Sequence, residues 1–331
     1  MYDMRVSGLA VLAAALAVSA AAPAMAAATI TVFDVSGATG TYADAINDPG
    51  AITGWYLDSA GSHGFVRATD GTITSFDVSG GSNAQPDSIN DKGAIAGYFQ
   101  VSGVYRSFLR EAGGKITTFY DTGATQATGI NDKETVTGSF EDTSDVWHGF
   151  VRSKDGTITG FDPTGSIGTY PFGINKAGAI TGYYLGSSEV YHGFVRAADG
   201  TVTSFDPTGS VYTEATGIND KGVIAGYYAD SSDKFHGFVR AADGTITSFD
   251  VSGGTGGTFA TSIDAKGAVA GYYVIFGGGY HGFERAPNGT ISTFDPPNSD
   301  YTRPESIAGH AAVAGYFSDT SGVYHGFLRG K

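Results

Sequence analysis

Six histidines recur in the tripeptide His-Gly-Phe and are the first residues whose chemistry needs an explanation. They are His63, His148, His192, His236, His281 and His325. Imidazole is a common metal ligand, so a repeated histidine could indicate metal binding. Equivalent positions of a repeated unit lie too far apart, however, to share one ion at bond lengths of about 2.1 Å. Arg106 stands at the same position in another copy and also donates hydrogen bonds, so we interpret the histidines as structural donors and expect no metal site.

Carboxylates near the start of four copies could do acid–base chemistry. They are Asp44, Asp87, Glu214 and Glu305. Pairs of carboxylates cleave glycosidic bonds when they flank the bond from two sides. If the copies surround a channel, Asp44, Asp87 and Glu305 could converge at its mouth as an acidic site. A solvated acidic rim is the simpler interpretation, and the sequence does not decide between the two.

Other catalytic signatures are missing from the sequence. It has no Gly-x-Ser-x-Gly nucleophile elbow, no His-Glu-x-x-His zinc motif and no phosphate-binding glycine loop followed by a helix. Asn-Asp pairs, such as Asn90-Asp91 and Asn219-Asp220, resemble half of a calcium loop. Lys and Gly follow these pairs, so we interpret them as turn caps, with weak calcium binding as the alternative. No cofactor is expected, and no catalytic residue is assigned.

All these residues belong to one repeat that accounts for nearly the whole chain. The dipeptide Phe-Asp recurs at intervals of 42–45 residues. Its phenylalanines are Phe33, Phe76, Phe161, Phe205, Phe249 and Phe294, and Phe119-Tyr120 holds the remaining slot. Each copy contains four segments rich in β-formers; in the fifth copy they are residues 214–219, 223–228, 235–240 and 245–250. Asp-Lys-Gly and Asp-Gly between them are strong hairpin signals, because Gly tolerates the positive φ that tight turns need.

Seven copies of a four-stranded unit with this period indicate a β-propeller. The last copy stops at residues 329–331, directly after its third strand. Residues 29–34 supply the missing fourth strand, and placing them in the last copy closes the ring and removes its open edges. We therefore predict an all-β, seven-bladed β-propeller of four-stranded antiparallel blades, as a single domain over residues 27–331.

The N-terminus has the features of a signal peptide. Arg5 precedes an apolar stretch over residues 6–22, and Ala24-Met25-Ala26 gives the small-x-small pattern of a cleavage site. We expect residues 1–26 to be removed on export. This predicts a secreted or periplasmic protein that is not inserted in a membrane after cleavage.

The composition limits the partners of the protein. The 331 residues include 51 Gly, 21 Phe, 19 Tyr and no Cys, and the formal net charge is -14. Without cysteine there is neither a disulfide framework nor a thiolate metal site. An acidic surface repels phosphate backbones, so we expect no nucleic-acid partner. A monomer that binds a carbohydrate or an extracellular protein fits these limits.

The fifth copy shows the repeat motif most completely. Residues 217–228 read Gly-Ile-Asn-Asp-Lys-Gly-Val-Ile-Ala-Gly-Tyr-Tyr, and residues 236–240 read His-Gly-Phe-Val-Arg. These motifs resemble the bacterial extracellular repeat proteins named for a His-Ala-Phe tripeptide, and the resemblance covers residues 29–331. This chain has Gly where the family name has Ala. The resemblance implies secretion and a repeat architecture but no agreed activity, so no catalytic residue is carried over from it.

Loop lengths distinguish the two faces of the predicted ring. The turns after the first and third strands have constant lengths, whereas the other two connections vary. Variable loops on a constant scaffold often carry function, so we predict binding through the variable face, with drift of unconstrained loops as the competing explanation. The most diverse column near that face stands four residues before each recurring Ile. It consists of Tyr42, Gln85, Gln126, Tyr170, Glu214, Phe259 and Arg303.

A second column, mostly aromatic, immediately precedes the recurring His. It consists of Tyr105, Trp147, Tyr191, Phe235, Tyr280 and Tyr324, with Ser62 in the first copy. Because the column is nearly uniform, we interpret it as packing between blades rather than as a set of sugar-stacking platforms.

These observations favour a secreted, non-enzymatic binding module that recognises a carbohydrate or another extracellular macromolecule through its variable face. Two alternatives stay open. One is a polysaccharide hydrolase or lyase that uses the channel-mouth carboxylates, and the other is a structural surface or matrix protein without a discrete ligand.

Overall fold

The computed structural model describes residues 28–120, 123–309 and 311–330. The expected signal peptide, residues 1–26, lies outside this part of the chain. The described residues form 28 β-strands and no helix. Within those ranges there is accordingly no helix long and apolar enough to cross a membrane.

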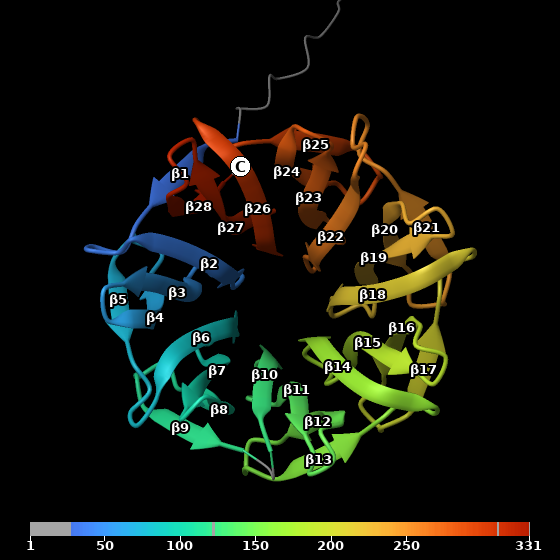
Figure 1. Ribbon diagram of the computed structural model, residues 1–331, viewed down its shortest axis with the longest axis horizontal. Helices are drawn as coiled ribbons and strands as arrows, with labels where there is room; N and C mark the ends of the chain where they lie inside the picture. Colours follow the sequence, from blue (N-terminus) through green and yellow to red (C-terminus); the bar gives the residue numbers. More distant parts are fainter. Residues whose placement is uncertain (1–27, 121–122, 310, 331) are drawn as a thin grey trace, which may run out of the picture.

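Figure 1 shows the sheets arranged as a ring around a central channel, with the first strand of each repeat innermost. Five sheets have four consecutive antiparallel strands each. The first contains β2 (Gly40–Ile46), β3 (Ile52–Asp58), β4 (Gly61–Arg67) and β5 (Ile73–Phe76). The next two contain β6 (Ser82–Ile89), β7 (Ile95–Val101), β8 (Val104–Arg110) and β9 (Ile116–Phe119), then β10 (Thr125–Ile130), β11 (Val136–Glu141), β12 (Trp147–Arg152) and β13 (Ile158–Phe161). The other two contain β14 (Ser166–Ile174), β15 (Ile180–Gly186), β16 (Tyr191–Arg196) and β17 (Val202–Phe205), then β18 (Ser210–Ile218), β19 (Ile224–Asp230), β20 (Phe235–Arg240) and β21 (Ile246–Phe249).

The remaining strands are joined in one eight-stranded sheet. They are β22 (Gly257–Ile263), β23 (Val269–Ile275), β24 (Gly279–Arg285), β25 (Ile291–Phe294), β26 (Ser299–Ala308), β27 (Ala312–Asp319), β28 (Tyr324–Arg329) and β1 (Ile30–Phe33). β1 pairs antiparallel with β28, from Ile30 opposite Arg329 to Phe33 opposite Gly326. The predicted place of the N-terminal strand in the last copy is therefore confirmed, as is the all-β fold of four-stranded antiparallel units.

Neighbouring repeats pack through one recurring pair of phenylalanines. The Phe at the centre of each third strand is fully buried, and it meets the Phe of the preceding Phe-Asp dipeptide edge to face. Phe238, for example, has no exposed surface and lies 6.0 Å from Phe205 between ring centroids. Arg240, at the end of the same strand, places its guanidinium 4.8 Å from the Phe205 ring centre. At the ring closure Phe65 meets Phe33 of β1 in the same way, so β1 occupies the position of a regular fourth strand.

The glycine of His-Gly-Phe is required by close packing within each repeat. A Cβ atom at Gly237 would lie 2.5 Å from Cζ of Phe249 on the neighbouring fourth strand. Real Cβ atoms essentially never approach that closely. The tripeptide therefore needs Gly at this position for Phe249 to pack against the third strand.

The recurring histidines hold the third and fourth strands together. In six repeats the imidazole Nδ1 lies 2.6–3.0 Å from the carboxylate of the Phe-Asp dipeptide. His325 makes this contact with Asp34, which follows β1, and so secures the ring closure. Where Arg106 replaces the histidine, Tyr120 replaces the aspartate, and the guanidinium lies 4.5 Å from the tyrosine ring centre. The interpretation of these residues as structural donors is therefore confirmed.

Candidate functional site

The inner strands of all seven repeats surround a cavity of about 530 Å³ at the centre of the ring. Each inner strand has a β-bulge two residues before its recurring Ile, as between Ala43 and Ala45 of β2. A bulge leaves one residue unpaired and re-aims its side chain. The seven bulge residues all line the cavity, and they are Asp44, Asp87, Thr128, Phe172, Thr216, Thr261 and Glu305.

The three threonines among the bulge residues serve the structure. Each donates a hydrogen bond of 2.8–3.0 Å from its Oγ1 to a backbone carbonyl on the next inner strand. The pairs are Thr128 with Pro171, Thr216 with Ala260 and Thr261 with Pro304. These bonds join neighbouring sheets around the channel.

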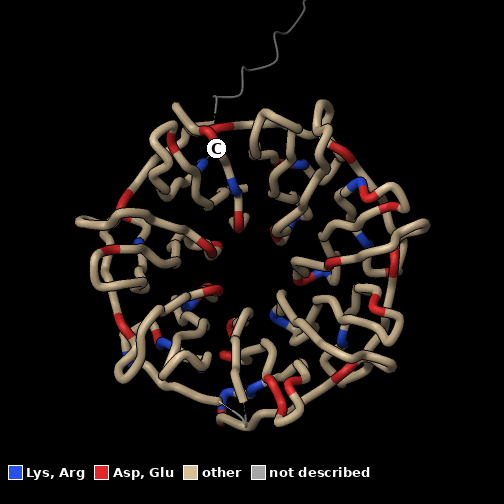
Figure 2. Tube along the Cα trace, viewed as in Figure 1, with Lys and Arg blue, Asp and Glu red and all other residues tan. Residues whose placement is uncertain are grey.

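The three carboxylates at the bulge position lie on neighbouring repeats and lack that bond. Oδ2 of Asp44 is buried and has no hydrogen-bond partner among the described residues. Asp87 also makes no side-chain hydrogen bond or ion pair within the part of the chain that the structure describes. Glu305 pairs with Nε of Arg303 at 2.6 Å. The sequence suggested that these carboxylates could converge, and they do line one cavity; Figure 2 shows acidic residues around the central opening.

Burial changes the acidity of all three carboxylates. Burial, followed by the charge of Glu305, raises the pKa of Asp87 to about 8. Burial also raises the pKa of Glu305 to about 7, although Arg303 opposes the shift. The pKa of Asp44 is raised well above its usual value by burial and by the charges of Asp87 and Glu305. Burial disfavours the charged form of a carboxyl group, so all three bind their protons more tightly than exposed carboxyls do.

Glu214 lines the same cavity from β18 and is fully hydrogen-bonded. The hydroxyls of Tyr212 and Tyr227 donate to its two carboxylate oxygens. Burial raises the pKa of Glu214, and these two hydrogen bonds oppose the shift. Glu214 is therefore a partnered carboxylate, unlike Asp44 and Asp87.

The predicted binding column is only partly brought to the cavity. Of its seven residues, Glu214 and Arg303 line the cavity, whereas Tyr42, Gln85, Gln126, Tyr170 and Phe259 do not. All seven stand two residues nearer the start of their strand than the bulge residues. Three of them stack on a second-strand partner, with ring centroids 3.9–5.0 Å apart. These pairs are Tyr42 with Trp55, Tyr170 with Tyr183 and Phe259 with Tyr272.

These second-strand partners were not singled out from the sequence, although they recur nine residues after each recurring Ile. They are Trp55, Tyr98, Ser139, Tyr183, Tyr227, Tyr272 and Tyr316.

The column before the recurring His lies beside them. Tyr324 contacts Tyr42 of the next repeat with centroids 5.0 Å apart, and Phe235 contacts Phe259 at 4.9 Å. Tyr280 and Tyr191 make equivalent contacts with Tyr301 and Tyr212, so packing between repeats is confirmed for these four residues.

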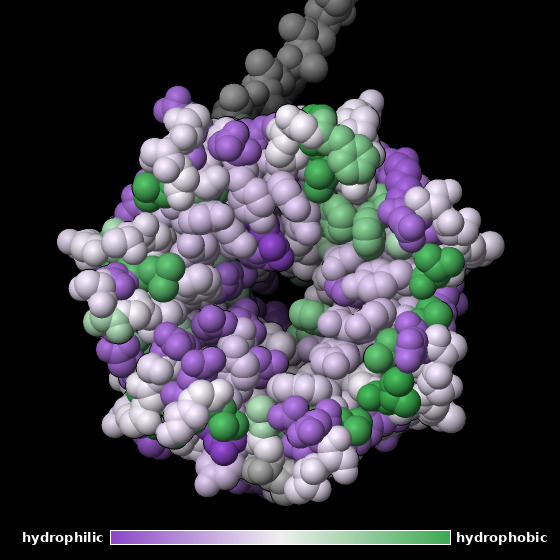
Figure 3. All heavy atoms as spheres, viewed as in Figure 1, coloured by the Kyte–Doolittle hydropathy of each residue, from purple (hydrophilic) through white to green (hydrophobic). Residues whose placement is uncertain are grey.

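Together these side chains form a continuous aromatic belt over the fourth, fifth, sixth, seventh and first repeats. Successive ring centroids are 3.9–6.4 Å apart. The belt comprises Tyr42, Trp55, Tyr170, Tyr183, Tyr191, Tyr212, Tyr227, Phe235, Phe259, Tyr272, Tyr280, Tyr301, Tyr316 and Tyr324. The belt is open over the second and third repeats: no ring contact among the described residues joins Tyr98 and Tyr105 to it, and Gln126 and Ser139 take the corresponding positions in the third repeat. Figure 3 shows a face of the ring with the channel opening at its centre.

The opposite end of the channel is formed by the Asn-Asp turns, around a smaller cavity of about 160 Å³. The Asn side chain accepts backbone N–H bonds within its own turn, as Asn90 does from Ala94 at 2.9 Å. The turn-cap interpretation is therefore confirmed. The same Asn also donates from Nδ2 to a backbone carbonyl of the next repeat, which the sequence did not reveal. This bond of 2.9–3.1 Å recurs at Asn47, Asn90, Asn131, Asn175 and Asn219.

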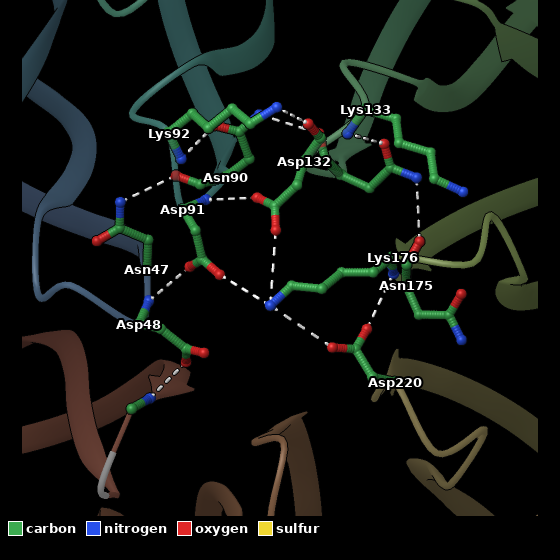
Figure 4. A network of polar contacts seen from close by, with 12 residues as sticks. Asn47, Asp48, Asn90, Asp91, Lys92, Asp132, Lys133, Asn175, Lys176 and Asp220 are labelled. Atoms are coloured by element: carbon green, nitrogen blue, oxygen red, sulfur yellow. Dashed lines mark hydrogen bonds and ion pairs between the residues drawn. The ribbon is translucent and has the colours of Figure 1, made fainter.

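One lysine forms ion pairs with three carboxylates at this end. Nζ of Lys176 lies 3.1 Å from Asp91, 3.5 Å from Asp132 and 3.6 Å from Asp220 (Figure 4). The hydrogen bond to Asp91 and the charges of Asp220 and Asp132 outweigh burial and raise the pKa of Lys176, so it stays protonated. Asp91 and Asp132 also accept backbone N–H groups from the neighbouring repeat. The carboxylates at this end are thus fully partnered.

Comparison with known proteins supports the architecture. No family model matches the chain, and no curated protein matches it significantly, so the resemblance to the His-Ala-Phe proteins rests on the motifs alone. Among solved structures, a streptogramin B lyase has a TM-score of 0.61 at 15% identity, covering 92% of this chain and 98% of its own. The β-propeller domain of the Trilobed protease from Pyrococcus furiosus has a TM-score of 0.62 at 9% identity, covering 88% and 95%. The virginiamycin B lyase from Staphylococcus aureus reaches 0.58 at 14% identity, covering 91% and 99%. At such identities the likeness shows the β-propeller fold and nothing about activity.

Proposed function

We propose that the ring has seven blades. The eight-stranded sheet is continuous only through one parallel bridge, between Tyr280 and Tyr301. On either side of that bridge are four strands, with β1 completing the last group. The edge-to-face Phe–Phe contact between neighbouring repeats occurs seven times, including the closure between Phe33 and Phe65. Seven equal contacts support seven equal blades.

We propose further that the protein is an exported, monomeric binding module, and that its ligand is a carbohydrate bound at the mouth of the channel. The observation that carries this proposal is the aromatic belt, which borders a cavity containing unpartnered carboxylates. Aromatic faces stack on the apolar faces of sugar rings, and a few polar groups in a concave site fix orientation. The stacked pairs of Tyr42, Tyr170 and Phe259 lie on three different inner strands, which suits a ligand of more than one sugar unit.

Export and binding are tested separately. N-terminal sequencing of the exported protein should give Ala27 as the first residue; an uncleaved N-terminus would contradict the expected signal peptide. A glycan array probed with the purified protein, with and without calcium, should give a specific hit. We expect Tyr42→Ala, Tyr170→Ala or Phe259→Ala to weaken the hit by roughly tenfold, and Tyr120→Ala, an exposed tyrosine outside the belt, to leave it unchanged. If the three belt variants bind like the wild type, the proposed site is wrong.

A polysaccharide hydrolase or lyase is the second candidate. It is favoured by the three neighbouring carboxyls with raised pKa values, since a carboxylic acid that stays protonated near neutral pH is what acid catalysis of glycoside cleavage needs. Incubation of an array hit with the protein should then release new reducing ends or unsaturated products. Asp87→Asn and Glu305→Gln should abolish that release. An intact ligand after long incubation would exclude this candidate and leave the binding module.

A further inference from the structure

The bulge position of the inner strands holds a threonine in some repeats and an acid in others, and the threonines have a structural role. At Thr128, Thr216 and Thr261 the side chain donates to the next inner strand. At Asp44, Asp87 and Glu305 the same position holds an acid on three neighbouring repeats. None of these three acids makes the threonine-type bond to the next inner strand among the described residues. The acids are confined to one side of the channel, Asp87 makes no side-chain hydrogen bond among the described residues, and Oδ2 of Asp44 has no partner there, which indicates a task other than joining the sheets.

A buried carboxylate oxygen without a partner provides an independent observation at this place. Most buried polar atoms in proteins are hydrogen-bonded, and an orphaned one needs an explanation. Oδ2 of Asp44 is such an atom among the described residues, and Asp44 lines the cavity. Arg303, the described cation that acts on Asp44, pairs with Glu305 and lies over the ring of Tyr272, with Cζ 5.4 Å from the ring centre. Asp44 and Asp87 are left without a counter-ion from the described residues.

The other end of the channel shows that the fold can supply a counter-ion from its own chain. There Lys176 reaches three carboxylates at 3.1–3.6 Å. No described lysine or arginine does the same for Asp44 and Asp87. A cation delivered by a ligand would complete the site, and the neighbouring tyrosine faces would favour positive charge as well.

We propose that the channel mouth binds a sugar that carries a free protonated amine. Asp44 and Asp87 ionise as its ammonium group enters between them, because a nearby positive charge favours the carboxylate form, and its ring stacks on the belt beside them. Tyr42 stands two residues before Asp44 on β2, and its stacked pair with Trp55 lies at the edge of the belt next to the acids. This inference rests on the proposed carbohydrate-binding function and specifies its ligand.

The test is calorimetric titration with two oligosaccharides of equal length, one of glucosamine and one of N-acetylglucosamine, at a pH where the free amines are charged. We expect the amine form to bind at least about tenfold more tightly. Asp44→Asn and Asp87→Asn should remove that preference, whereas Glu111→Gln, which deletes one exposed charge far from the channel, should keep it. Both channel variants are isosteric, and thermal melting checks that they fold.

The outcomes separate this inference from the proposed function. Equal or tighter binding of the N-acetylated form would overturn the amine assignment while leaving carbohydrate binding intact. A lysine oligomer that binds as tightly as the glucosamine oligomer would overturn the assignment to a sugar. Failure of both oligosaccharides, while another glycan on the array binds, would also overturn the amine assignment. If no glycan binds at all, both the inference and the proposed function fail.

Discussion

The two ends of the channel are built from the same inner strands, yet they treat their carboxylates differently. One end is formed by the Asn-Asp turns, which have a constant length, and we call it the constant end. There Asp91, Asp132 and Asp220 share the ammonium of Lys176. Asp91 and Asp132 also accept backbone N–H groups. The other end lies on the side of the loops of variable length, and we call it the variable end. There Asp44 and Asp87 face the cavity without a partner among the described residues.

This difference separates structure from function within one repeat. A column that is satisfied in nearly every copy, such as the Asn that caps one turn and bonds to the next repeat, holds the ring together. At the bulge position, three copies have a threonine that makes its hydrogen bond to the next inner strand, and three neighbouring copies have an acid instead. Unsatisfied groups that share one cavity are what a binding site requires, because a ligand gains most where the protein has left interactions unmade.

The largest effect on stability is expected at the constant end. Asn131 is buried; it donates to the carbonyl of Asn175 and accepts from the backbone of Lys133 and Thr135. Asn131→Ala should lower the free energy of unfolding by about 2–4 kcal/mol, because it removes three hydrogen bonds and leaves buried groups unpaired. Urea unfolding measures the change. Gln126→Ala, on the inner strand β10 that precedes this turn, is the control and should cost less than about 0.5 kcal/mol.

Removing a carboxylate at the variable end is expected to stabilise the protein rather than destabilise it. Asp87 has a pKa of about 8 in the folded protein against an ordinary value near 3.8, so the unfolded chain loses this proton first as the pH rises. Stability should therefore fall between about pH 4 and pH 8 on account of this group. Asp87→Asn should raise the free energy of unfolding at pH 8 by on the order of 1–3 kcal/mol and change little at pH 4. A variant that is less stable at pH 8 would show that the carboxylate stabilises the fold.

Removal of the built-in counter-ion should have a smaller effect, because the Lys176 side chain is half exposed. Lys176→Met should destabilise the protein by about 1–2 kcal/mol, since three carboxylates then repel one another. The loss should shrink at high salt, which screens that repulsion. Lys154→Met removes an exposed pair with Glu134 and serves as the control, with almost no effect expected.

The smallest effect is expected at the ring closure. Burial lowers the pKa of His325, but the hydrogen bond and charge of Asp34 outweigh it, so the pKa is raised. The stabilisation from this pair is fully present below about pH 6.5 and is lost as the pH rises through the folded pKa. His325→Ala should cost at most about 1 kcal/mol at pH 5.5 and less at pH 8.5. Hydrogen exchange of β1 amides should become faster in the variant at the lower pH; equal exchange at both values would contradict this role.

Much of the fold could be predicted from the sequence because the same pattern of strands and turns occurs in seven copies. The period, the hairpin turns and the early end of the last copy were enough to place β1 beside β28. The paired replacement of His by Arg106 and of Asp by Tyr120 also pointed to a structural contact. The proposed count of seven blades rests on the same repeats, whereas the expected export rests on residues outside the described part of the chain.

The site was harder to predict because β-bulges break the alternation on which strand patterns depend. In a regular strand, residues two apart share a face, so Tyr42 and Asp44 would have the same surroundings. The bulge at Asp44 directs that carboxylate into the cavity, while Tyr42 stacks on Trp55 outside its lining. The link from each Asn to the next repeat, and the reach of Lys176 across the channel, join residues about 41–85 positions apart and leave no local signal.

The most direct test of the account compares one aspartate from each end of the channel in the same assay. The affinity for the array hit and the free energy of unfolding are measured for Asp44→Asn and for Asp132→Asn. We expect Asp44→Asn to lose about tenfold in affinity without loss of stability, and Asp132→Asn to lose stability with affinity unchanged. Unchanged affinity in Asp44→Asn, or a loss of affinity in Asp132→Asn alone, would contradict the division of the channel into a structural end and a binding end.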